Sequence, residues 1–366
     1  MVDPKGLIGD IHSETFRRHL EYSHYLGLEN SQARLVILTA SAQDKQIIFE
    51  SEFLLLLNYF KQRGYFIKKS RYGSDELEST GITPFILVAG EPFETFLCTL
   101  IASRRFKSRI PIQLQLHFDP EQFRLGNGLY GKIKYLFTLI AIMYCDSLRL
   151  VNGFQMRSIP KRIYKSKRIT ISPLPIVESA TTGKVFTTHR PRNIGIFGRL
   201  HSERGIKEIL IAIAKLPAGF FDKVVVAGAG QLEGDFIKGL NQLVGEQNVI
   251  YLGHLEPESQ QEFWDKIGVL ISFPRYEAYG IAIRESLCHG IPVIATRSIG
   301  SELLESECPI DWIRILADPL NTTELKSSLD IAFSLETSNA FMYQSRKSNV
   351  ENQKKLVRSW LQASQN

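Results

Sequence analysis

Short apolar runs alternate with longer amphipathic segments through the first half of the chain. The runs are rich in β-branched residues and have the length of buried strands, at residues 33–39, 85–88, 111–116 and 147–151. Segments with helical spacing lie before and between them, at residues 13–26, 46–62, 92–105 and 132–144. Strands that alternate with helices predict a parallel, doubly wound sheet, so the fold class is α/β.

The second half repeats this alternation. Apolar runs predict strands at residues 193–197, 223–227, 248–252, 269–271, 292–296 and 312–318. Helical spacing is found at residues 258–266, 323–335 and 342–363. A stretch rich in Pro, Ser, Thr and Gly separates the two halves. We therefore predict two domains, with boundaries at residues 1–175 for the first domain, 176–191 for a linker, 192–340 for the second domain, and 341–366 for a helix that crosses back to the first.

Residues 272–290, SFPRYEAYGIAIRESLCHG, lie between two predicted strands and hold two carboxylates. Glu277 precedes a short helix opened by Gly280, and Glu285 lies inside that helix, eight positions later. The first amides of a helix favour a diphosphate, whereas carboxylates suit neighbouring sugar hydroxyls. The stretch therefore indicates a site for a sugar nucleotide. A pair of surface glutamates on an ordinary βαβ unit is the alternative.

This stretch resembles the donor loop of the retaining glycosyltransferases of family 4, the glycosyl transferases group 1. The resemblance is carried by the E-x7-E spacing, by the glycine after Tyr279, and by the continuation E-S-L-x-x-G-x-P-V-I-A-T. It implies the GT-B fold, in which two Rossmann-like, doubly wound parallel-sheet domains face a central cleft. It also implies that a hexose passes from a nucleoside diphosphate sugar, of UDP or GDP type, to an acceptor hydroxyl with retention of configuration.

The resemblance implies a further set of donor-binding residues. Gly198, Arg199 and Leu200 match a G-R-L motif, and Arg204 stands where the family has a lysine five positions after the arginine. Both cations would hold the diphosphate, and arginine keeps the charge of lysine. Glu277 would orient the hexose and Glu285 the ribose. Donor contacts are also expected from three residues at the start of the helix, Tyr279, Gly280 and Ile281.

In the first domain, His117 follows a predicted strand, where the family commonly places a histidine near the donor sugar. A histidine that satisfies loop carbonyls is the alternative. Asp119 is a weaker candidate for contacting the acceptor. The glycine-rich turn expected near the N-terminus is irregular, since only Gly6, Gly9 and Asp10 follow a poor strand.

The resemblance implies neither a metal nor another cofactor, and the chain has no D-x-D motif. The four cysteines show no spacing suited to zinc. The N-terminus has no apolar secretory core, and no apolar run reaches the roughly 20 residues that span a bilayer. We therefore expect a cytoplasmic protein.

Positive charge is concentrated in the first half. Residues 1–180 hold 24 Lys and Arg against 17 Asp and Glu, whereas the remainder holds 20 against 21. The basic clusters could meet anionic lipid heads or nucleic acid, or form an ordinary solvated surface. No aromatic and basic recognition motif supports nucleic acid. We therefore expect peripheral contact with the inner face of a membrane, and an acceptor that is a glycan or a lipid-linked glycan of cell-surface polysaccharide synthesis.

Two other functions fit the same fold. A GT-B sugar-nucleotide epimerase would convert free donor without an acceptor. A GT-B partner subunit without catalytic activity would bind the donor without turnover, and the irregular N-terminal turn favours this alternative.

Overall fold

The computed structural model describes residues 1–3, 8, 10–11, 13–39, 47–58, 84–104, 109–126, 128–174, 176, 190–335 and 339–363. The chain divides into two compact units, and each unit has its own sheet. The first unit comprises Met1–Pro175 and Val350–Asn366, and the second comprises Ile176–Asn349.

The first unit is built on an eight-stranded sheet with the order β3-β4-β2-β1-β5-β6-β7-β8. The strands are β1 (Val2–Asp3), β2 (Leu35–Thr39), β3 (Ile47–Glu50), β4 (Leu54–Asn58), β5 (Leu87–Ala89), β6 (Ile112–Leu116), β7 (Ser147–Leu150) and β8 (Arg168–Ile171). All the pairings are parallel except that of β3 with β4. The strand β1 lies at the centre of the sheet but has only two residues, which agrees with the poor strand expected there.

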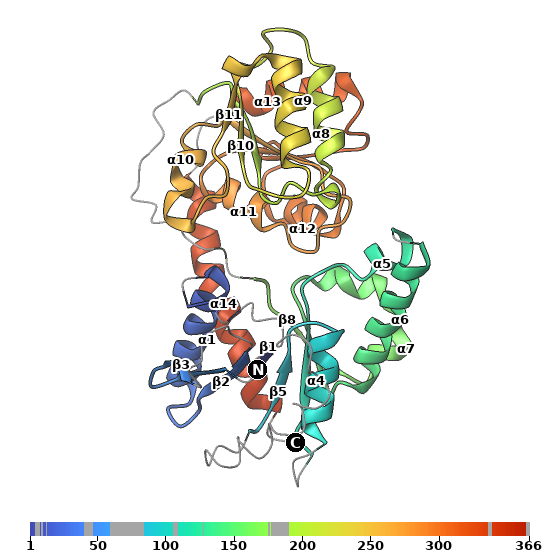
Figure 1. The fold of residues 1–366 in the computed structure, drawn as a ribbon, viewed down its shortest axis with the longest axis vertical. Helices are drawn as coiled ribbons and strands as arrows, with labels where there is room; N and C mark the ends of the chain where they lie inside the picture. The colour runs from blue at the N-terminus through green and yellow to red at the C-terminus, as the bar shows by residue number, and fades with distance from the viewer. Residues whose placement is uncertain are drawn as a thin grey trace. The chain divides into compact units, whose positions relative to one another are not determined.

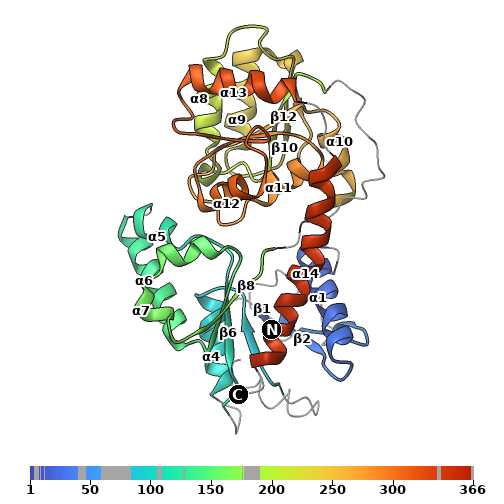
Figure 2. The same ribbon diagram turned by 180° about the vertical axis from the view of Figure 1, so that it is seen from behind.

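Helices cover both faces of this sheet, as Figures 1 and 2 show. On one face α1 (Glu14–Glu29) and the end of α14 (Asn339–Ala363) share a core with Ile37 and Val88. On the other face α4 (Glu94–Ser103) and α6 (Gly128–Tyr144) pack on Leu114 and Leu148. Two short helices, α5 (Glu121–Leu125) and α7 (Lys161–Tyr164), lie beside α6.

The helix expected over residues 46–62 is wrong within the part of that range that the structure describes. Residues 47–50 and 54–58 form an antiparallel hairpin, β3 and β4, at the edge of the sheet. The segment contains Leu54–Asn58, five residues that pair in parallel with all of β2, and the buried Leu54 completes the core beneath α1. Pairing with an existing strand therefore outweighs the helical propensity of leucine.

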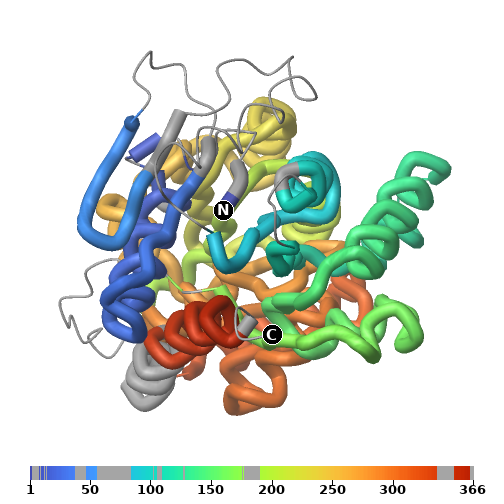
Figure 3. The backbone as a smooth tube through the Cα atoms, turned by 90° about the horizontal axis from the view of Figure 1, so that it is seen from below, coloured from blue at the N-terminus to red at the C-terminus, as the bar shows by residue number. Residues whose placement is uncertain are grey.

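The helix α14 returns to the first unit and lies alongside α1, which Figures 2 and 3 both show. The Trp360 indole is buried against Tyr22, with ring centroids 6.1 Å apart, and its N–H donates to Gln113 Oε1 at 2.8 Å. Arg358 forms a bidentate ion pair with Glu29 at 2.9 and 3.0 Å. Trp360 therefore packs in the core of the first unit.

The second unit is built on a six-stranded, wholly parallel sheet with the order β11-β10-β9-β12-β13-β14. Its strands are β9 (Ile194–Phe197), β10 (Val224–Ala227), β11 (Val249–Tyr251), β12 (Val269–Ser272), β13 (Val293–Thr296) and β14 (Ile313–Leu316). The order reverses between β9 and β12, which is where α/β sheets place their ligands.

Successive residues of each central strand enter different cores. Val224 and Val226 face α8 (Ile206–Ala214), α9 (Glu233–Val244) and α13 (Thr322–Ser334). Val225 and Ala227 face α10 (Gln260–Trp264), α11 (Ile281–Cys288) and α12 (Ile299–Glu307). The unit thus has three layers, because a strand directs alternate side chains to opposite faces.

No helix in the described ranges is long and apolar enough to cross a membrane.

Candidate functional site

The turn after β9 carries the first candidate residues, and the neighbouring turn after β10 holds it in place. The Gly198 N–H donates to Ala227 O at 2.9 Å, and the Leu200 N–H donates to Ala229 O at 3.0 Å. Arg199 lies between these two bonds, and its side chain is exposed. The backbone of the turn is therefore fixed while the guanidinium stays open to a ligand.

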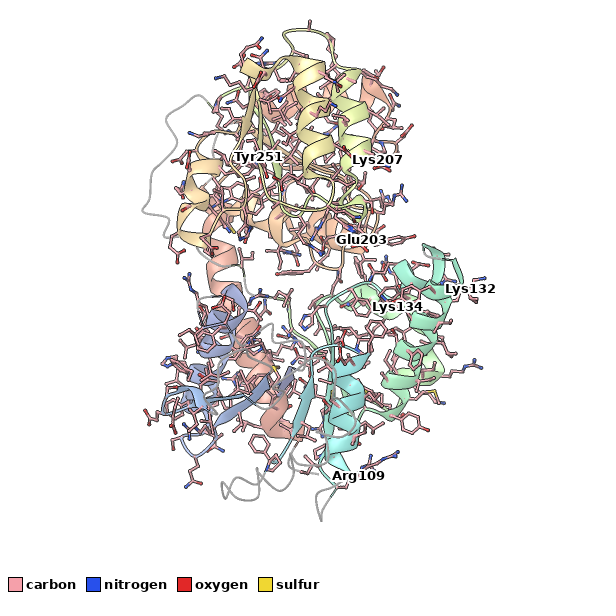
Figure 4. The ribbon with its side chains drawn as sticks, in the orientation of Figure 1. Arg109, Lys132, Lys134, Glu203, Lys207 and Tyr251 are labelled. Carbon is pink, nitrogen blue, oxygen red and sulfur yellow. The ribbon has the colours of Figure 1, made fainter. Side chains whose placement is uncertain are left out.

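The following turn positions Arg204 through a glycine. The 3₁₀ turn Ser202–Arg204 ends at Gly205, whose φ of +66° lies in the left-handed region. A Cβ atom on Gly205 would lie 1.9 Å from the carbonyl oxygen of Phe273, just beyond β12. Only glycine allows this approach of two turns. Figure 4 labels Glu203, which lies within this turn, and Lys207, which lies in the first turn of α8.

This approach brings Arg204 to the loop before α11. Its Nη1 lies 2.5 Å from Glu277 Oε2, and the Arg204 and Glu277 side chains are 34% and 16% exposed. The Gly300 N–H donates to the Glu277 carbonyl oxygen at 2.9 Å, which fixes the loop to the start of α12. Two candidates that lie 73 residues apart in sequence therefore form one ion pair at the ends of β9 and β12.

The helix α11 begins at Gly280, which has a φ of +78°. Gly280 is the N-cap, as expected for the residue that opens the helix, and the first helical residue is Ile281, directly after the Glu277 loop. Behind them Arg284 is 8% exposed, and its guanidinium lies 4.0 Å from the centre of the Tyr279 ring. Arg284 also donates to Tyr279 O at 3.2 Å and to Glu307 at 2.8 Å. Arg284 thus ties the loop to the helix.

The other two candidates on this segment are buried. The Tyr279 side chain is 5% exposed, and burial raises the pKa of its hydroxyl. The Tyr279 ring packs against the Arg284 guanidinium. The part of Tyr279 that borders the Glu277 loop is therefore its backbone. Glu285 is 7% exposed, and its carbonyl oxygen accepts from His289 N–H at 3.1 Å. Glu285 belongs to the inner side of α11, eight positions after Glu277.

A separate cavity of about 550 Å³ lies between α9 and β11. Glu233, Lys238, Asn241 and Tyr251 are among its lining residues, and none of the candidate residues belongs to it. The Tyr251 hydroxyl donates to Gly228 O at 3.0 Å, and burial beside Glu233 raises the pKa of Tyr251 to about 12 (Figure 4). This tyrosine supports the turn after β10.

His117 lies at the carboxyl end of β6 in the first unit, as predicted, and is half-buried there. Burial and the positive charges of Arg149 and Arg18 hold the pKa of His117 well below its usual value. Arg149 is 1% exposed, and it donates to neutral oxygens, among them Gln115 Oε1 at 2.8 Å and Ser172 O at 3.1 Å. The imidazole is therefore neutral at pH 7, so one ring nitrogen can donate a hydrogen bond and the other can accept one.

Asp119, the weaker acceptor candidate, has a local structural role. It is 6% exposed and accepts from the Ser158 hydroxyl at 2.7 Å and from the Glu121 N–H at 3.0 Å. Burial raises the pKa of its carboxyl group. These bonds fix the start of α5. Gly9 lies outside the described residues, as does Gly6.

One positioning residue escaped the sequence reasoning. Gly205 is required for the approach of Arg204. The available signal was a glycine directly after a cation, but the role of Gly205 can be inferred only once β12 is known to lie beside β9. Among the described residues, no three His, Cys, Asp or Glu side chains are grouped so that they could hold a metal ion.

Residues 191–330 match the family model described as Glycosyl transferases group 1. One curated relative is the uncharacterized glycosyltransferase MJ1607 of Methanocaldococcus jannaschii, which is 27% identical over 119 residues, 32% of this chain and 30% of that protein. Another is the uncharacterized glycosyltransferase YqgM of Bacillus subtilis, which is 25% identical over 206 residues, 55% of this chain and 57% of that protein. The chain thus matches less than two thirds of the length of either relative.

Solved structures of the same fold cover almost the whole chain. Sucrose-phosphate synthase from Thermosynechococcus elongatus has a TM-score of 0.66 at 13% identity, over 99% of this chain and 95% of that one. The lipopolysaccharide outer core galactosyltransferase WaaB has a TM-score of 0.63 at 15% identity, over 97% and 96%. Anabaena HepE, solved with UDP and glucose, has a TM-score of 0.62 at 13% identity, over 100% and 96%. At these identities the likeness concerns the fold, which is GT-B, as predicted.

Proposed function

We propose that this chain transfers a hexose from a nucleoside diphosphate sugar to an acceptor hydroxyl, because residues 191–330 match the family model of the group 1 glycosyltransferases. The acceptor is a glycan or a lipid-linked glycan of cell-surface polysaccharide synthesis. Transfer proceeds with retention of configuration and without a metal ion. The donor is of UDP or GDP type, and UDP is supported by its presence with glucose in the structure of HepE, which shares the fold.

The observation that carries this proposal is the ion pair between Arg204 and Glu277 beside the start of α11. The pair is 2.5 Å long and partly buried, so both side chains are oriented before a ligand arrives. Arg204 has five N–H donors, and the bond to Glu277 leaves others for a phosphate oxygen. Glu277 keeps acceptor capacity for a hexose hydroxyl. The pair thus offers a cation for the phosphate and a carboxylate for the sugar of one sugar nucleotide.

The charge that develops on the leaving diphosphate needs stabilisation. Arg199 and Arg204 supply two cations, and the first amides of α11 after Gly280 supply oriented donors. Each charge-assisted hydrogen bond contributes roughly 1.5–3 kcal/mol. Glu285 binds the ribose in this proposal. No side chain acts as a nucleophile: the acceptor attacks from the side of the leaving group, and a phosphate oxygen takes its proton.

In this proposal His117, which belongs to the first unit, forms a hydrogen bond with the donor sugar. Its depressed pKa keeps the imidazole neutral, so it interacts with a sugar hydroxyl as a hydrogen-bonding group without adding charge. The basic surface of the same unit contacts the inner face of a membrane, which would bring a lipid-linked acceptor within reach.

A transfer assay tests the proposal. Purified protein is incubated with UDP- and GDP-sugars, first alone and then with membrane lipid extract, and released nucleotide and glycosylated product are measured. We expect nucleotide release that depends on the extract and falls at least about tenfold in Glu277→Ala. Epimerisation of free donor would indicate an epimerase, and donor binding without turnover would indicate a partner subunit.

A further inference from the structure

The helix α6 presents a row of large apolar side chains to solvent. Leu129 is 76% exposed, and Leu136, Phe137 and Met143 are each 55 or 56% exposed. The complete set, here called the α6 apolar face, is Leu129, Tyr130, Ile133, Leu136, Phe137, Ile140, Met143 and Tyr144. Contiguous exposed apolar surface of this kind marks an interaction site more often than scattered single residues do.

Helical geometry places these side chains on one side. They recur at intervals of three or four residues, which is the spacing of neighbours on a helix surface. Gly131, Thr138, Ala141 and Ile142 lie on the opposite side and are buried against the rest of the first unit. The helix is therefore apolar on both sides, but the residues that the structure describes cover only one of them.

Bonds to other segments fix the orientation of α6. The Tyr135 hydroxyl donates to Ser158 O at 2.8 Å. At the end of the helix, Lys167 Nζ donates to Met143 O at 2.7 Å and to Cys145 O at 2.6 Å. These contacts satisfy carbonyls at the C-terminus of the helix and place a cation there, which the helix dipole favours. The apolar face is thus held outward by a well-anchored helix.

Exposed cations lie on α6 and on the segments next to it. Residues 122–176 hold ten Lys and Arg, of which Arg149 is buried and Arg124 pairs with Glu121, and a single acidic residue, Asp146, which pairs with Arg109. Lys132 is exposed on α6 itself, whereas Lys134 covers the aromatic rings of Phe93, Phe123 and Tyr130 (Figure 4). The neighbouring helix α7 adds Lys161 and Arg162, both exposed.

We propose that the α6 apolar face inserts into the headgroup region of an anionic lipid bilayer, with the cations of α6 and α7 against lipid phosphates. An amphipathic helix with an apolar face beside Lys and Arg is the structure that binds such a surface. A second copy of the chain fits the face less well, because face-to-face pairing would bring two sets of cations together. The inference specifies the membrane contact in the proposed function and rests on it.

Vesicle flotation tests this inference without any sugar nucleotide. The full chain is mixed with vesicles of phosphatidylcholine alone, or with roughly one third phosphatidylglycerol, at low and high salt. The test variant is Leu136→Gln/Phe137→Gln/Ile140→Gln, which alters only exposed positions of α6. Its matched control is Ile211→Gln/Leu243→Gln, which removes apolar side chains of similar exposure, 47 and 45%, from the second unit. A charge variant, Lys161→Gln/Arg162→Gln, is compared with Lys238→Gln.

We expect binding to the anionic vesicles that salt weakens, a loss of about 10- to 100-fold in the α6 variant, and a smaller loss in the charge variant. Both controls should bind as the unaltered chain does. The proposal is overturned if the unaltered chain does not float with anionic vesicles, or if the α6 variant still floats. It is also overturned if sedimentation shows a dimer that the α6 variant dissociates. Nucleotide binding, measured separately, reports on the proposed function alone.

Discussion

Replacing Gly205 by alanine tests whether the close approach of two turns builds the Arg204 and Glu277 pair. Gly205 has a φ of +66°, and an added Cβ atom would lie 1.9 Å from Phe273 O, whereas real Cβ contacts essentially never fall below 3.0 Å. The two turns must therefore separate by about 1 Å. That displacement breaks the 2.5 Å contact between Arg204 and Glu277.

Gly219→Ala is a matched control for this substitution. Gly219 lies in the same unit with a φ of +73°, but an added Cβ atom there would meet nothing within 4 Å. It thus carries the left-handed backbone penalty, about 1 kcal/mol, without a clash. Gly205→Ala adds the lost charge-assisted hydrogen bond and the displacement, so we expect a total of about 3 kcal/mol or more.

Urea unfolding followed by tryptophan fluorescence measures the difference. Trp264 and Trp312 belong to the core of the second unit, whereas Trp360 belongs to the first. A Trp360→Phe background therefore confines the signal to the second unit. We expect Gly205→Ala to reduce its free energy of unfolding by at least about 2 kcal/mol more than Gly219→Ala does. Equal effects of the two substitutions would refute the proposed role of Gly205.

Three further predictions concern other sites. Arg204→Ala should weaken donor-nucleotide binding by about 10- to 100-fold in calorimetry. The control is Arg314→Ala, which should leave this affinity unchanged. Arg314 is also ion-paired, and its side chain is 30% exposed, against 34% for Arg204. Burial lowers the pKa of His289 to about 4. As the pH falls, the unfolded state therefore binds a proton before the folded state does. The free energy of unfolding should drop by about 3 kcal/mol between pH 7 and 4 through this group. His289→Phe, which keeps the stacking on Trp264, should remove that part of the pH dependence from urea titrations. Trp360→Ala should destabilise the first unit by about 3–5 kcal/mol in thermal or urea unfolding, and an unchanged midpoint would contradict the packing described for α14.

The sequence predicts the region around α11 in the second unit well because local signals agree there. Gly280, Gly290 and Pro292 delimit α11, and β-branched runs bracket it, so the helix over Ile281–Cys288 and the strands beside it lie where expected. Propensity, capping and hydrophobic pattern all favour the same structure at this point.

The hairpin of β3 and β4 was missed because its signal is not local. Residues 46–62 are rich in leucine and isoleucine without clear alternation, and such runs suit a helix or a strand equally. The neighbour β2 decides between them, since its edge accepts β4 over five residue pairs. Tertiary pairing of this kind cannot be derived from the segment itself.

The contact between Arg204 and Glu277 needs the sheet order as well. The sequence supplies both residues, and their partnership follows only once β9 and β12 are neighbours and Gly205 lets the turns meet. The exposure of the α6 apolar face could not be predicted from the sequence either. Its periodicity resembles that of a core helix, and only the structure shows that one side lacks a covering element among the described residues.

The central claim is that the second unit binds a nucleoside diphosphate sugar through Arg199, Arg204, Glu277 and Glu285. Calorimetry of the purified chain with UDP, GDP, ADP and their common sugars, first without metal and then with it, tests that claim most directly. The account predicts that one nucleotide binds without metal and that Arg199→Ala and Glu285→Ala each weaken it by at least about tenfold. Failure of every nucleotide to bind, or unchanged affinity in both variants, would contradict it.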